Sequence, residues 1–555
     1  MTMNAAEVLL ARGLERRTAL ACGAQSMTYG ALREAVSRAA SVWKKHGLAP
    51  GDRVAVKLPD GMAWVQAFLG ALWAGGVGVA VNPRIPEEEW RFIVREGAFR
   101  FIVADVQGGD AAPAARERLV TLDDWARATR AAAPIEPAAM DEESPAFWTH
   151  SSGSSGRPKA VVHAHRFALH VERVAEELLG VTAEDRLYAS SKLFFAYPLG
   201  NSLFSGLKLG ATVVLDPAWP NAAAVAATVR EQRPSVLFSV PSLYRNLLKE
   251  GLARELAGHG VRVCVSAGEA LPASLRDEWR RQTGLTIVNG YGASETLSLV
   301  LLNLRDGEEL APAPGVAIRA LEPLDRGVPT RLSIFATTRA LGYWNRPDAE
   351  AESFREGAFC PADLFLRTES GRWRFAGRED SLVKVFGRWV NLIELEERLA
   401  AACPGIVEGA AVSLPDADGV DAIAFFYVEK AGASSLADAL RAEIAALQPY
   451  RRPRWLHAVP ALPRTATGKL LRRKLSELHR TLETSAAASA DGVAGGQPAA
   501  GARSLSGLLS RMRCWPNGDE CKALGAANSS AYSPAEQRRR RGVWPQPATA
   551  SPTGS

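Results

Sequence analysis

The chain has 555 residues, with 66 lysine and arginine residues against 60 aspartate and glutamate residues. Hydrophobic residues make up 47% and charged residues 23%, which is ordinary for a globular protein and excludes a collagen-like chain, a wholly disordered chain and a disulfide-rich miniprotein. At roughly 100–200 residues per domain, this length predicts several domains or one large domain with a smaller satellite.

Most of the excess positive charge lies near the end of the chain. Residues 484–555 carry eight basic and four acidic side chains, a balance of +4, whereas residues 1–483 carry only +2. Because a nearly neutral body offers no broad basic face, we expect no nucleic-acid partner. The quartet Arg538–Arg541 leaves a nucleic-acid or localisation role open for the tail, although such runs are usually just solvated.

Cysteine usage and hydropathy bear on the cellular compartment. The six cysteines are scattered, without a Cys-x-x-Cys pair or zinc-ligand spacing. Cys264 is predicted to be a small apolar residue on a buried strand. The chain does not open with a basic region followed by an apolar core, and no run of 18 apolar residues occurs in it. We therefore expect a cytoplasmic protein without a membrane partner.

The first part of the chain alternates helical and strand-like patterns. Residues 31–47 and 62–74 have apolar side chains at helical spacing, and residues 53–58 and 75–81 are typical of strands. Further strands, separated by helices, are predicted at residues 211–215, 235–240, 262–266 and 286–289. Strands spaced by helices predict an α/β fold with parallel-rich sheets covered by helices.

From about residue 380 the pattern restarts on a smaller scale. Helices at 390–401 and 435–447 and strands at 407–414 and 422–428 predict a small α+β domain. Beyond Glu483 the chain is rich in Ala, Gly, Ser and Pro, which predicts disorder. The predicted organisation is a large N-terminal domain over 1–379, a small mobile C-terminal domain over 380–483 and a disordered tail over 484–555.

The most informative segment, residues 147–163, is typical of a strand, a loop and a second strand. Its loop carries hydroxyls, glycines and one cation, namely Ser151, Ser152, Gly153, Ser154, Ser155, Gly156 and Lys159. Glycines let backbone N–H groups converge on an anion, and hydroxyls with an ammonium add donors suited to a polyphosphate. The adjacent Gly-Lys of a Walker loop is absent, and a Ser/Gly run is often only a linker. The strand patterns on both sides favour a phosphate loop.

Two short segments further along the chain also have a distinctive composition. They are Ser266-Ala-Gly-Glu-Ala-Leu271 and Asn289-Gly-Tyr-Gly-Ala-Ser-Glu295. Together with the loop they resemble the phosphate and adenine-pocket segments of the adenylate-forming superfamily, which includes acyl-CoA synthetases, luciferases and nonribosomal adenylation domains. Ser155 and Ala160 depart from the Thr and Gly that are usual in that loop.

The resemblance implies roles for individual residues. The nucleotide-binding residues of these two segments would be Gly268, Glu269, Asn289, Tyr291 and Ser294. Tyr291 offers a flat face to the purine, and Asn289 offers a partner for its polar edge. Glu295 is a hard carboxylate suited to Mg²⁺.

The ribose side of the nucleotide site is implied by two further segments. Phe359-Cys-Pro-Ala-Asp363 stands where the superfamily has Thr-Gly-Asp, with Pro361 and Ala362 as departures. Asp363 is retained and would accept the ribose hydroxyls. Arg378, in the segment that joins the two domains of these enzymes, matches the ribose-side arginine.

The resemblance extends to the parts that move. Asp380 matches the hinge about which the small domain of these enzymes rotates, and Gly387 matches the glycine beside their CoA tunnel. Residues 463–473 look like the C-terminal lysine motif. Lys469 is therefore the candidate catalytic residue, expected to bridge the carboxylate and the α-phosphate.

Residues 191–201 are similar to one branch of the superfamily, the benzoate–CoA ligases and their hydroxy- and aminobenzoate relatives. In that branch the substrate pocket would be formed by Ala196, Tyr197, Gly292, Ser298 and Leu299. Ser298 stands where benzoate ligases usually carry His, an exchange that enlarges the pocket and keeps a hydrogen-bonding group. We therefore expect a substituted benzoate, such as an amino- or hydroxybenzoate, and leave plain benzoate open as the less favoured substrate. The pair Phe194-Phe195 is predicted to be ordinary core packing.

The implied activity is that of an ATP-dependent acid–thiol ligase. It would activate an aromatic carboxylate as acyl-AMP and transfer it to CoA, using ATP, Mg²⁺ and CoA and releasing AMP and pyrophosphate. One alternative is an aryl-acid adenylating enzyme that loads a separate carrier protein. Another is a catalytically weakened nucleotide-binding relative, suggested by the departures at Ser155, Ala160, Pro361 and Ala362. Assembly as a homodimer also stays open.

Overall fold

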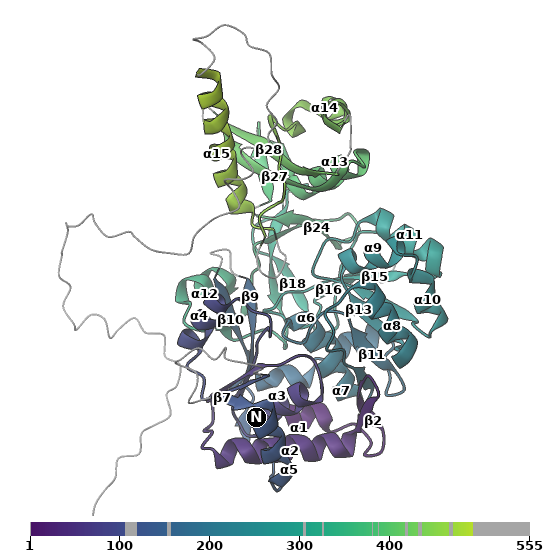
Figure 1. Ribbon diagram of the computed structural model, residues 1–555, viewed down its shortest axis with the longest axis vertical. Helices are drawn as coiled ribbons and strands as arrows, with labels where there is room; N and C mark the ends of the chain where they lie inside the picture. Colours follow the sequence, from purple (N-terminus) through teal and green to yellow (C-terminus); the bar gives the residue numbers. More distant parts are fainter. Residues whose placement is uncertain are drawn as a thin grey trace, which may run out of the picture. The chain divides into compact units, whose positions relative to one another are not determined.

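The structure is a computed structural model (Figure 1) that describes residues 2–105, 119–152, 157–303, 307–324, 327–379, 381–386, 388–416, 420–430, 436–464 and 470–491. For Ser152, Arg473 and residues 484–491 it describes the backbone only. The chain divides after Glu483 into two units. Of the second unit, only the end of helix α15 (Arg472–Asp491) is described, so the rest of the predicted tail lies outside the described residues.

One sheet of the N-terminal part contains the predicted strands of the first hundred residues. Its order is β20 (Gly342–Tyr343), β10 (Pro158–Ala164), β9 (Pro145–Ser152), β5 (Val77–Ala80), β4 (Arg53–Lys57), β6 (Phe101–Ala104) and β7 (Leu119–Thr121). The strands from β9 to β7 pair in parallel, whereas β10 pairs antiparallel with both β9 and β20. The predicted strands at 53–58 and 75–81 are confirmed as β4 and β5.

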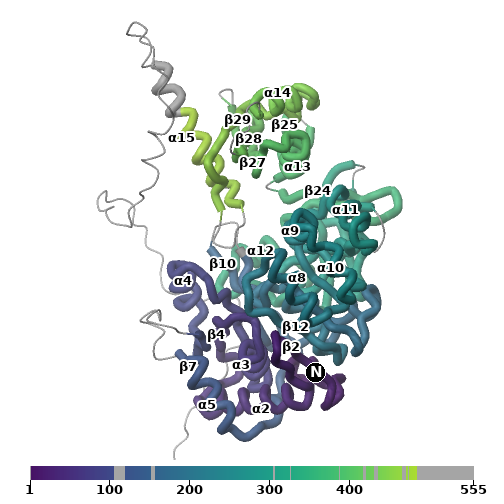
Figure 2. Tube along the Cα trace, turned by 45° about the vertical axis from the view of Figure 1, so that its right-hand side comes forward, coloured from purple at the N-terminus to yellow at the C-terminus, as the bar shows by residue number. Residues whose placement is uncertain are grey.

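The predicted helices next to this sheet are also present. Residues 31–47 correspond to α2 (Tyr29–Lys45), which begins where the Thr28 hydroxyl accepts a hydrogen bond from the backbone N–H of Ala31. Residues 62–74 correspond to α3 (Met62–Trp73), which is apolar on nearly every side and therefore packs between α2 and the sheet. Figure 2 shows these helices gathered beside α5 (Leu122–Ala131).

A second sheet carries the later predicted strands. Its order is β17 (Ala311–Pro312), β16 (Leu301–Asn303), β15 (Ile287–Tyr291), β14 (Val263–Ser266), β13 (Val236–Ser239), β11 (Arg186–Ala189), β12 (Thr212–Val214), β2 (Thr18–Cys22) and β3 (Gln25–Thr28). The run from β15 to β2 is parallel. Parallel strands end at the same edge, so the segments that follow β13, β14 and β15 come together there.

Alternate side chains of these strands enter different cores. Leu237, Cys264 and Ile287 pack with the helices α8 (Ala222–Gln232), α9 (Pro241–Lys249), α10 (Ala253–Gly258) and α11 (Ala273–Thr283), which lie together in Figures 1 and 2. Phe238 and Val265 point into a different core, which also contains Leu299. Cys264 is fully buried, as its sequence context predicted. Burial also raises the pKa of its thiol to about 12.

A smaller antiparallel sheet precedes the C-terminal domain. It contains β21 (Phe354–Arg355), β22 (Ala358–Phe359), β19 (Thr330–Phe335), β23 (Asp363–Arg367) and β24 (Trp373–Arg378), and β18 (Ala317–Ala320) also pairs with β19. Strands β23 and β24 pair so that Asp363 lies directly opposite Arg378. Two residues that are distant in sequence are thereby placed side by side.

The C-terminal domain has sheets of its own. They consist of β25 (Leu382–Val385) with β26 (Arg388–Asn391), and of β27 (Ile406–Pro415), β28 (Asp421–Glu429) and β29 (Trp455–Ala458). The helix predicted from residue 390 is α13 (Leu392–Ala402), which starts later because the Asn391 side chain accepts the backbone N–H groups of Ile393 and Glu394. The helix predicted at 435–447 is α14 (Leu436–Ala446).

Two further findings bear on the sequence predictions. Phe194 is buried, as predicted. The prediction that Phe195 is a core residue is wrong, because Phe195 directly precedes α6 (Ala196–Pro198) and is 38% exposed. Its ring packs on that of Phe194 instead, with 4.3 Å between the ring centres.

Within the described ranges, no helix is both long and apolar enough to cross a membrane.

Candidate active site

The predicted phosphate loop is a hairpin between β9 and β10. Lys159 lies opposite Ser151 in the antiparallel register. The loop residues Gly153, Ser154, Ser155 and Gly156 lie outside the described residues, as does the side chain of Ser152. The Ser151 hydroxyl is buried and has no hydrogen-bond partner among the described residues. A buried hydroxyl without a partner is available to a ligand oxygen.

Strand β20 brings Tyr343 next to this hairpin. Because β20 pairs with β10, Tyr343 lies opposite Val161, two residues from Lys159. The ammonium of Lys159 lies 4.4 Å from the centre of the Tyr343 ring. The phenol of the same tyrosine donates a 2.6 Å hydrogen bond to Oε1 of Glu295. One aromatic side chain therefore holds both a cation and a carboxylate.

Glu295 is a buried carboxylate, only 7% exposed. Burial raises its pKa, while the hydrogen bond from Tyr343 and the charge of Lys159 act in the opposite direction. Tyr343 occupies Oε1, which leaves Oε2 as a hard oxygen donor. Such a donor fits Mg²⁺, which is commonly held by one or two carboxylates together with substrate phosphates and water.

The segment before Glu295 is held by a histidine of β10. His163 donates from Nε2 to the carbonyl oxygen of Ser294 at 2.9 Å, and its ring stacks on Phe147 with 4.6 Å between the centres. Burial lowers the pKa of His163 to about 4, so the ring is uncharged at neutral pH. The histidine therefore positions the Ser294–Glu295 segment without adding charge to the site.

The predicted ribose residues come together around Asp363. The phenol of Tyr291 donates a 2.5 Å hydrogen bond to its Oδ2, and Arg378 lies 3.5 Å from its Oδ1. Burial raises the pKa of Tyr291 well above its ordinary value, and the charges of Asp363 and Glu295 raise it further. The Tyr291 ring stands edge-on to Phe365, with 4.9 Å between the centres. Tyr291 and Asp363 thus form one fixed pair at the end of β15.

The remaining predicted nucleotide residues lie at the ends of neighbouring parallel strands. Asn289 is on β15, directly opposite Ser266 at the end of β14. Gly268 follows β14 with a φ of +85°, a conformation that favours glycine. Glu269 accepts hydrogen bonds from both the hydroxyl and the backbone N–H of Ser242, near the start of α9. Its carboxylate therefore stabilises that helix start.

The predicted aryl pocket is assembled by Asn201, which the sequence analysis did not single out. Asn201 lies in the π-helical segment Leu199–Phe204, where its Nδ2 donates to the carbonyl of Tyr197 at 2.9 Å. Its Oδ1 accepts the backbone N–H of Leu299 at 3.4 Å. The two predicted walls are therefore joined by one amide side chain.

The pocket walls are closely packed against each other. The Tyr197 side chain lies in the same apolar core as Leu299 and donates a hydrogen bond of 3.2 Å to the Val265 carbonyl. A Cβ at Gly292 would lie 3.0 Å from the Ser298 carbonyl oxygen and 3.4 Å from Cα of Leu299. Glycine is therefore required for this close approach. Ala196, at the start of α6, is buried.

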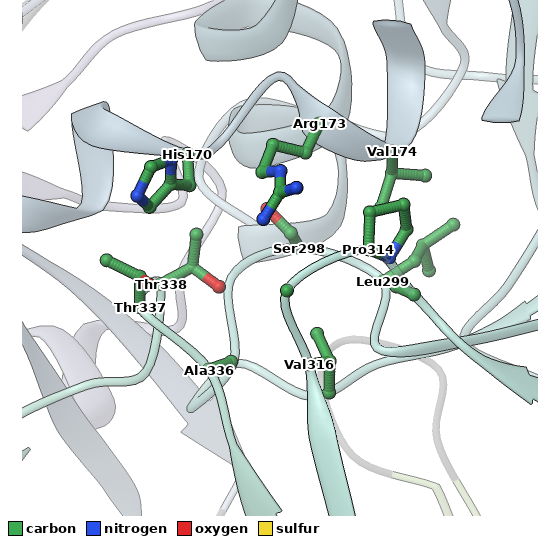
Figure 3. A pocket seen from close by; sticks show the side chains of 12 residues that line it. His170, Arg173, Val174, Ser298, Leu299, Pro314, Val316, Ala336, Thr337 and Thr338 are labelled. Carbon is green, nitrogen blue, oxygen red and sulfur yellow. The ribbon is translucent and has the colours of Figure 1, made fainter. Parts of the chain in front are cut away.

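A cavity of about 20 Å³ lies beside Ser298 (Figure 3). Its lining includes Ser298, Leu299, His170, Arg173 and Thr338. The Ser298 hydroxyl is buried and, within the described part of the chain, has no hydrogen-bond partner. A cavity of this size accommodates a group as large as a water molecule. A hydroxyl-sized substituent next to Ser298 would therefore have both space and a polar partner.

Three further predicted site residues, besides those of the phosphate loop, lie outside the described part of the chain. Lys469, Asp380 and Gly387 lie outside the described residues, so their catalytic, hinge and tunnel roles stay predictions. Conversely, Tyr343, Asn201 and His163 carry contacts that the sequence analysis did not assign. Only the position of Asn201, within the benzoate-type segment 191–201, was a signal that could have identified it.

Comparisons with known proteins agree with this arrangement. Residues 10–330 match the AMP-binding enzyme family, and residues 394–469 match the AMP-binding enzyme C-terminal domain. The chain is 36% identical to a 3-hydroxybenzoate–CoA ligase of Aromatoleum sp. strain CIB, over 86% of this chain and 97% of that protein. It is 34% identical to a 3-hydroxybenzoate–CoA/4-hydroxybenzoate–CoA ligase of Thauera aromatica, with the same coverage.

A solved structure gives a similar result. The crystal structure of an anthranilate CoA ligase in complex with anthranoyl-AMP superposes with a TM-score of 0.78 at 26% identity. The match covers 86% of this chain and 97% of that one.

Proposed function

We propose that this chain, which belongs to the AMP-binding enzymes and among them to the ATP-dependent, AMP-forming aryl-acid–CoA ligases of the benzoate type, acts on a hydroxy-substituted benzoate. The first candidate for this acid is 3-hydroxybenzoate. The two curated relatives described above are both named for 3-hydroxybenzoate. An aminobenzoate is the second candidate, since the solved relative is an anthranilate ligase.

The observation that carries this proposal is the unpartnered hydroxyl of Ser298. It is buried beside a cavity with space for a group the size of water, on the wall that also contains Leu299. A site built around such a hydroxyl discriminates against a ligand that leaves it unpaired, because a buried polar group without a partner costs about 1–3 kcal/mol. Plain benzoate would leave Ser298 unpaired, whereas a ring hydroxyl would satisfy it.

The chemistry proceeds in two half-reactions. A carboxylate oxygen of the acid attacks the α-phosphorus of ATP, the bond to the β-phosphate oxygen breaks, and pyrophosphate leaves with the bonding electron pair. The thiolate of CoA then attacks the acyl carbon, and AMP leaves. In the first step Lys159 and the 153–156 loop hold the outer phosphates. Lys469 bridges the carboxylate and the α-phosphate and offsets negative charge as it redistributes there.

The ribose pair and the carboxylate position the nucleotide for this step. Asp363 accepts a hydrogen bond from Tyr291 and lies beside Arg378, and it would accept the ribose hydroxyls. Glu295 would hold Mg²⁺ through Oε2, and the ion when bound would offset phosphate charge. Asp380 is the proposed hinge, and Gly387 is proposed to line the path of the CoA thiol.

The deciding experiment is a panel of benzoates assayed with ATP, Mg²⁺ and CoA, with the thioester products identified by mass. We expect the highest kcat/KM for 3-hydroxybenzoate and a clearly lower value for benzoate. A preference for benzoate over every ring-substituted analogue would overturn the substrate assignment. Formation of aryl-AMP without aryl-CoA, together with transfer to a carrier protein, would instead support the carrier-loading alternative.

Two substitutions separate the substrate assignment from the reaction itself. Ser298→Ala should lower kcat/KM for 3-hydroxybenzoate by about 5- to 20-fold, because one neutral hydrogen bond is lost, and should change kcat/KM for benzoate little. Ser298→His fills the cavity and should move the preference toward benzoate. Equal changes for both acids would mean that Ser298 does not contact the substituent.

A further inference from the structure

The C-terminal domain contains a cluster of side chains of metal-ligating type on strand β29 and helix α15. His457 lies on β29, and His479 and Glu483 lie on α15. Nε2 of His457 is 2.9 Å from Nδ1 of His479, and one ligand atom from each of the three residues lies within 4.8 Å of the others. His479 and Glu483 are four residues apart, so they project from the same face of the helix.

The amphipathic pattern of α15 explains this convergence. Leu475 is fully buried and packs, together with Leu478 and Leu482, against the core of the β27–β28–β29 sheet. Leucines at this spacing turn one face of the helix toward the sheet. His479 and Glu483 follow Leu478 and Leu482 directly in sequence, and they therefore lie along the edge of the buried face, next to strand β29.

Both imidazole rings are held in place by aromatic neighbours. His457 packs on Phe426, with 4.9 Å between the ring centres, and His479 meets the edge of Trp455 at 4.7 Å. His479 is only 9% exposed, whereas Glu483 lies at the solvent side of the cluster. A metal site held by packed rings needs little reorganisation when the ion binds.

The three side chains can each offer one ligand atom to a common centre, namely two imidazole nitrogens and one carboxylate oxygen.

We propose that His457, His479 and Glu483 bind a divalent transition-metal ion of the Zn²⁺ class, which ties α15 to the edge strand β29. Two imidazoles and one carboxylate are an established ligand set for Zn²⁺, with a further position left for water. Metal–nitrogen bonds of about 2.0–2.1 Å in a tetrahedral site place the two nitrogens about 3.3 Å apart. Without metal, one of these two nitrogens donates a hydrogen bond to the other at 2.9 Å. Metal binding replaces that bond: the donor ring changes to its other neutral tautomer, and the two nitrogens move slightly apart. Mg²⁺ prefers oxygen ligands and is not expected to compete.

The test is metal binding by the full chain after removal of metal with a chelator. Co²⁺ is titrated in and followed by its visible absorption, and Zn²⁺ is then used to displace it. We expect one tightly bound ion per chain, and we expect His457→Ala and His479→Ala each to weaken that binding by at least about 100-fold. Glu483→Gln, an exposed and nearly isosteric change, should weaken it by at least about tenfold while leaving the packing intact.

The matched control is His46→Ala, which changes an exposed histidine at the end of α2 in the large domain and should bind Co²⁺ as the wild type does. Zn²⁺ should also raise the unfolding temperature of the wild type and of this control, but not that of the His479→Ala protein. Unchanged binding in the His457, His479 and Glu483 variants would place the metal elsewhere and overturn the proposal. Failure of the wild type to bind either ion would also overturn it.

Discussion

Tyr343 donates its phenolic hydrogen to Oε1 of Glu295 over 2.6 Å, although the two residues come from separate strand and loop segments. The aromatic ring of Tyr343 contacts the ammonium of Lys159, which lies 4.4 Å from the ring centre. This arrangement holds a cation and a carboxylate near each other without a direct ion pair between them. In the proposed function both groups are available to the nucleotide, Lys159 for a phosphate and Glu295 for a metal ion.

Replacing Tyr343 with Phe should shift the pH dependence of adenylation. The pKa of Glu295 is already raised by burial, and the hydrogen bond from Tyr343 is the largest influence that lowers it. Without that bond, the pKa of Glu295 rises further. On acidification, Glu295 therefore becomes protonated at a higher pH in the variant than in the wild type. We expect pyrophosphate release at neutral pH to fall by about 10-fold and the acid limb of the profile to move upward.

Tyr343→Phe keeps the ring under Lys159, so Tyr343→Leu is the informative companion. The leucine variant loses both contacts and should be slower still, with a raised KM for ATP. An acid limb that stays in place in the phenylalanine variant would mean that Glu295 does not act as a carboxylate in this step.

Asn201→Ala should weaken binding of the aryl acid more than binding of the nucleotide. Asn201 joins the two walls of the proposed aryl pocket, through the Tyr197 carbonyl and the Leu299 backbone N–H. Loss of both hydrogen bonds should raise KM for the aryl acid by about 10-fold and leave KM for ATP nearly unchanged. Steady-state kinetics with each substrate varied in turn measure this difference. Equal changes in both KM values would indicate a general loss of structure instead.

Asp60→Asn should change how stability depends on pH. Both carboxylate oxygens of Asp60 accept the backbone N–H of Leu193, at 3.2 and 3.1 Å, in the segment that leads into the aryl pocket. Burial raises the pKa of Asp60 to about 7, and the charge of Lys192 opposes that rise. An unfolded aspartate titrates at about 3.9. The folded protein therefore binds a proton more readily than the unfolded chain between about pH 4 and about pH 7.

The contribution of Asp60 to stability is thus fully present below about pH 4 and is lost as pH rises through about 7. Asn keeps an acceptor for Leu193 and does not titrate. The free energy of unfolding should accordingly fall more from about pH 5 to about pH 8 in the wild type than in Asp60→Asn. Urea unfolding at both values provides the comparison, and identical slopes would place the titration elsewhere.

Lys469→Ala should separate the two half-reactions. Removing a preorganised charge at the α-phosphate should slow adenylation by about 10²–10³-fold, whereas thioester formation from supplied aryl-adenylate should be largely kept. Rapid-quench measurement of each half-reaction tests this, with Lys474→Ala as a nearby control lysine. Equal losses in both half-reactions would contradict the assignment of Lys469.

The alternation of apolar residues predicted individual elements well, because such periodicity is local. The strand expected at 262–266 is β14 (Val263–Ser266), and the strand expected at 407–414 is β27 (Ile406–Pro415). The predictions were wrong where a single local contact sets the end of an element or the exposure of a side chain. Asn391 caps α13 and so delays its start, and the Phe195 ring, placed at the residue before α6, remains partly exposed.

The sequence by itself determined the family and the order of the motifs, and it predicted Lys159, Glu295 and Asp363 as site residues, because these belong to short segments of defined composition. Only the tertiary structure decided what holds them. Pairing of β20 with β10 brings Tyr343 to Glu295, and pairing of β23 with β24 brings Arg378 to Asp363. The linear pattern named Arg378 and Asp363 separately but gave no sign of their contact or of Tyr343, since contacts between separate segments depend on strand register and helix packing rather than on spacing along the chain.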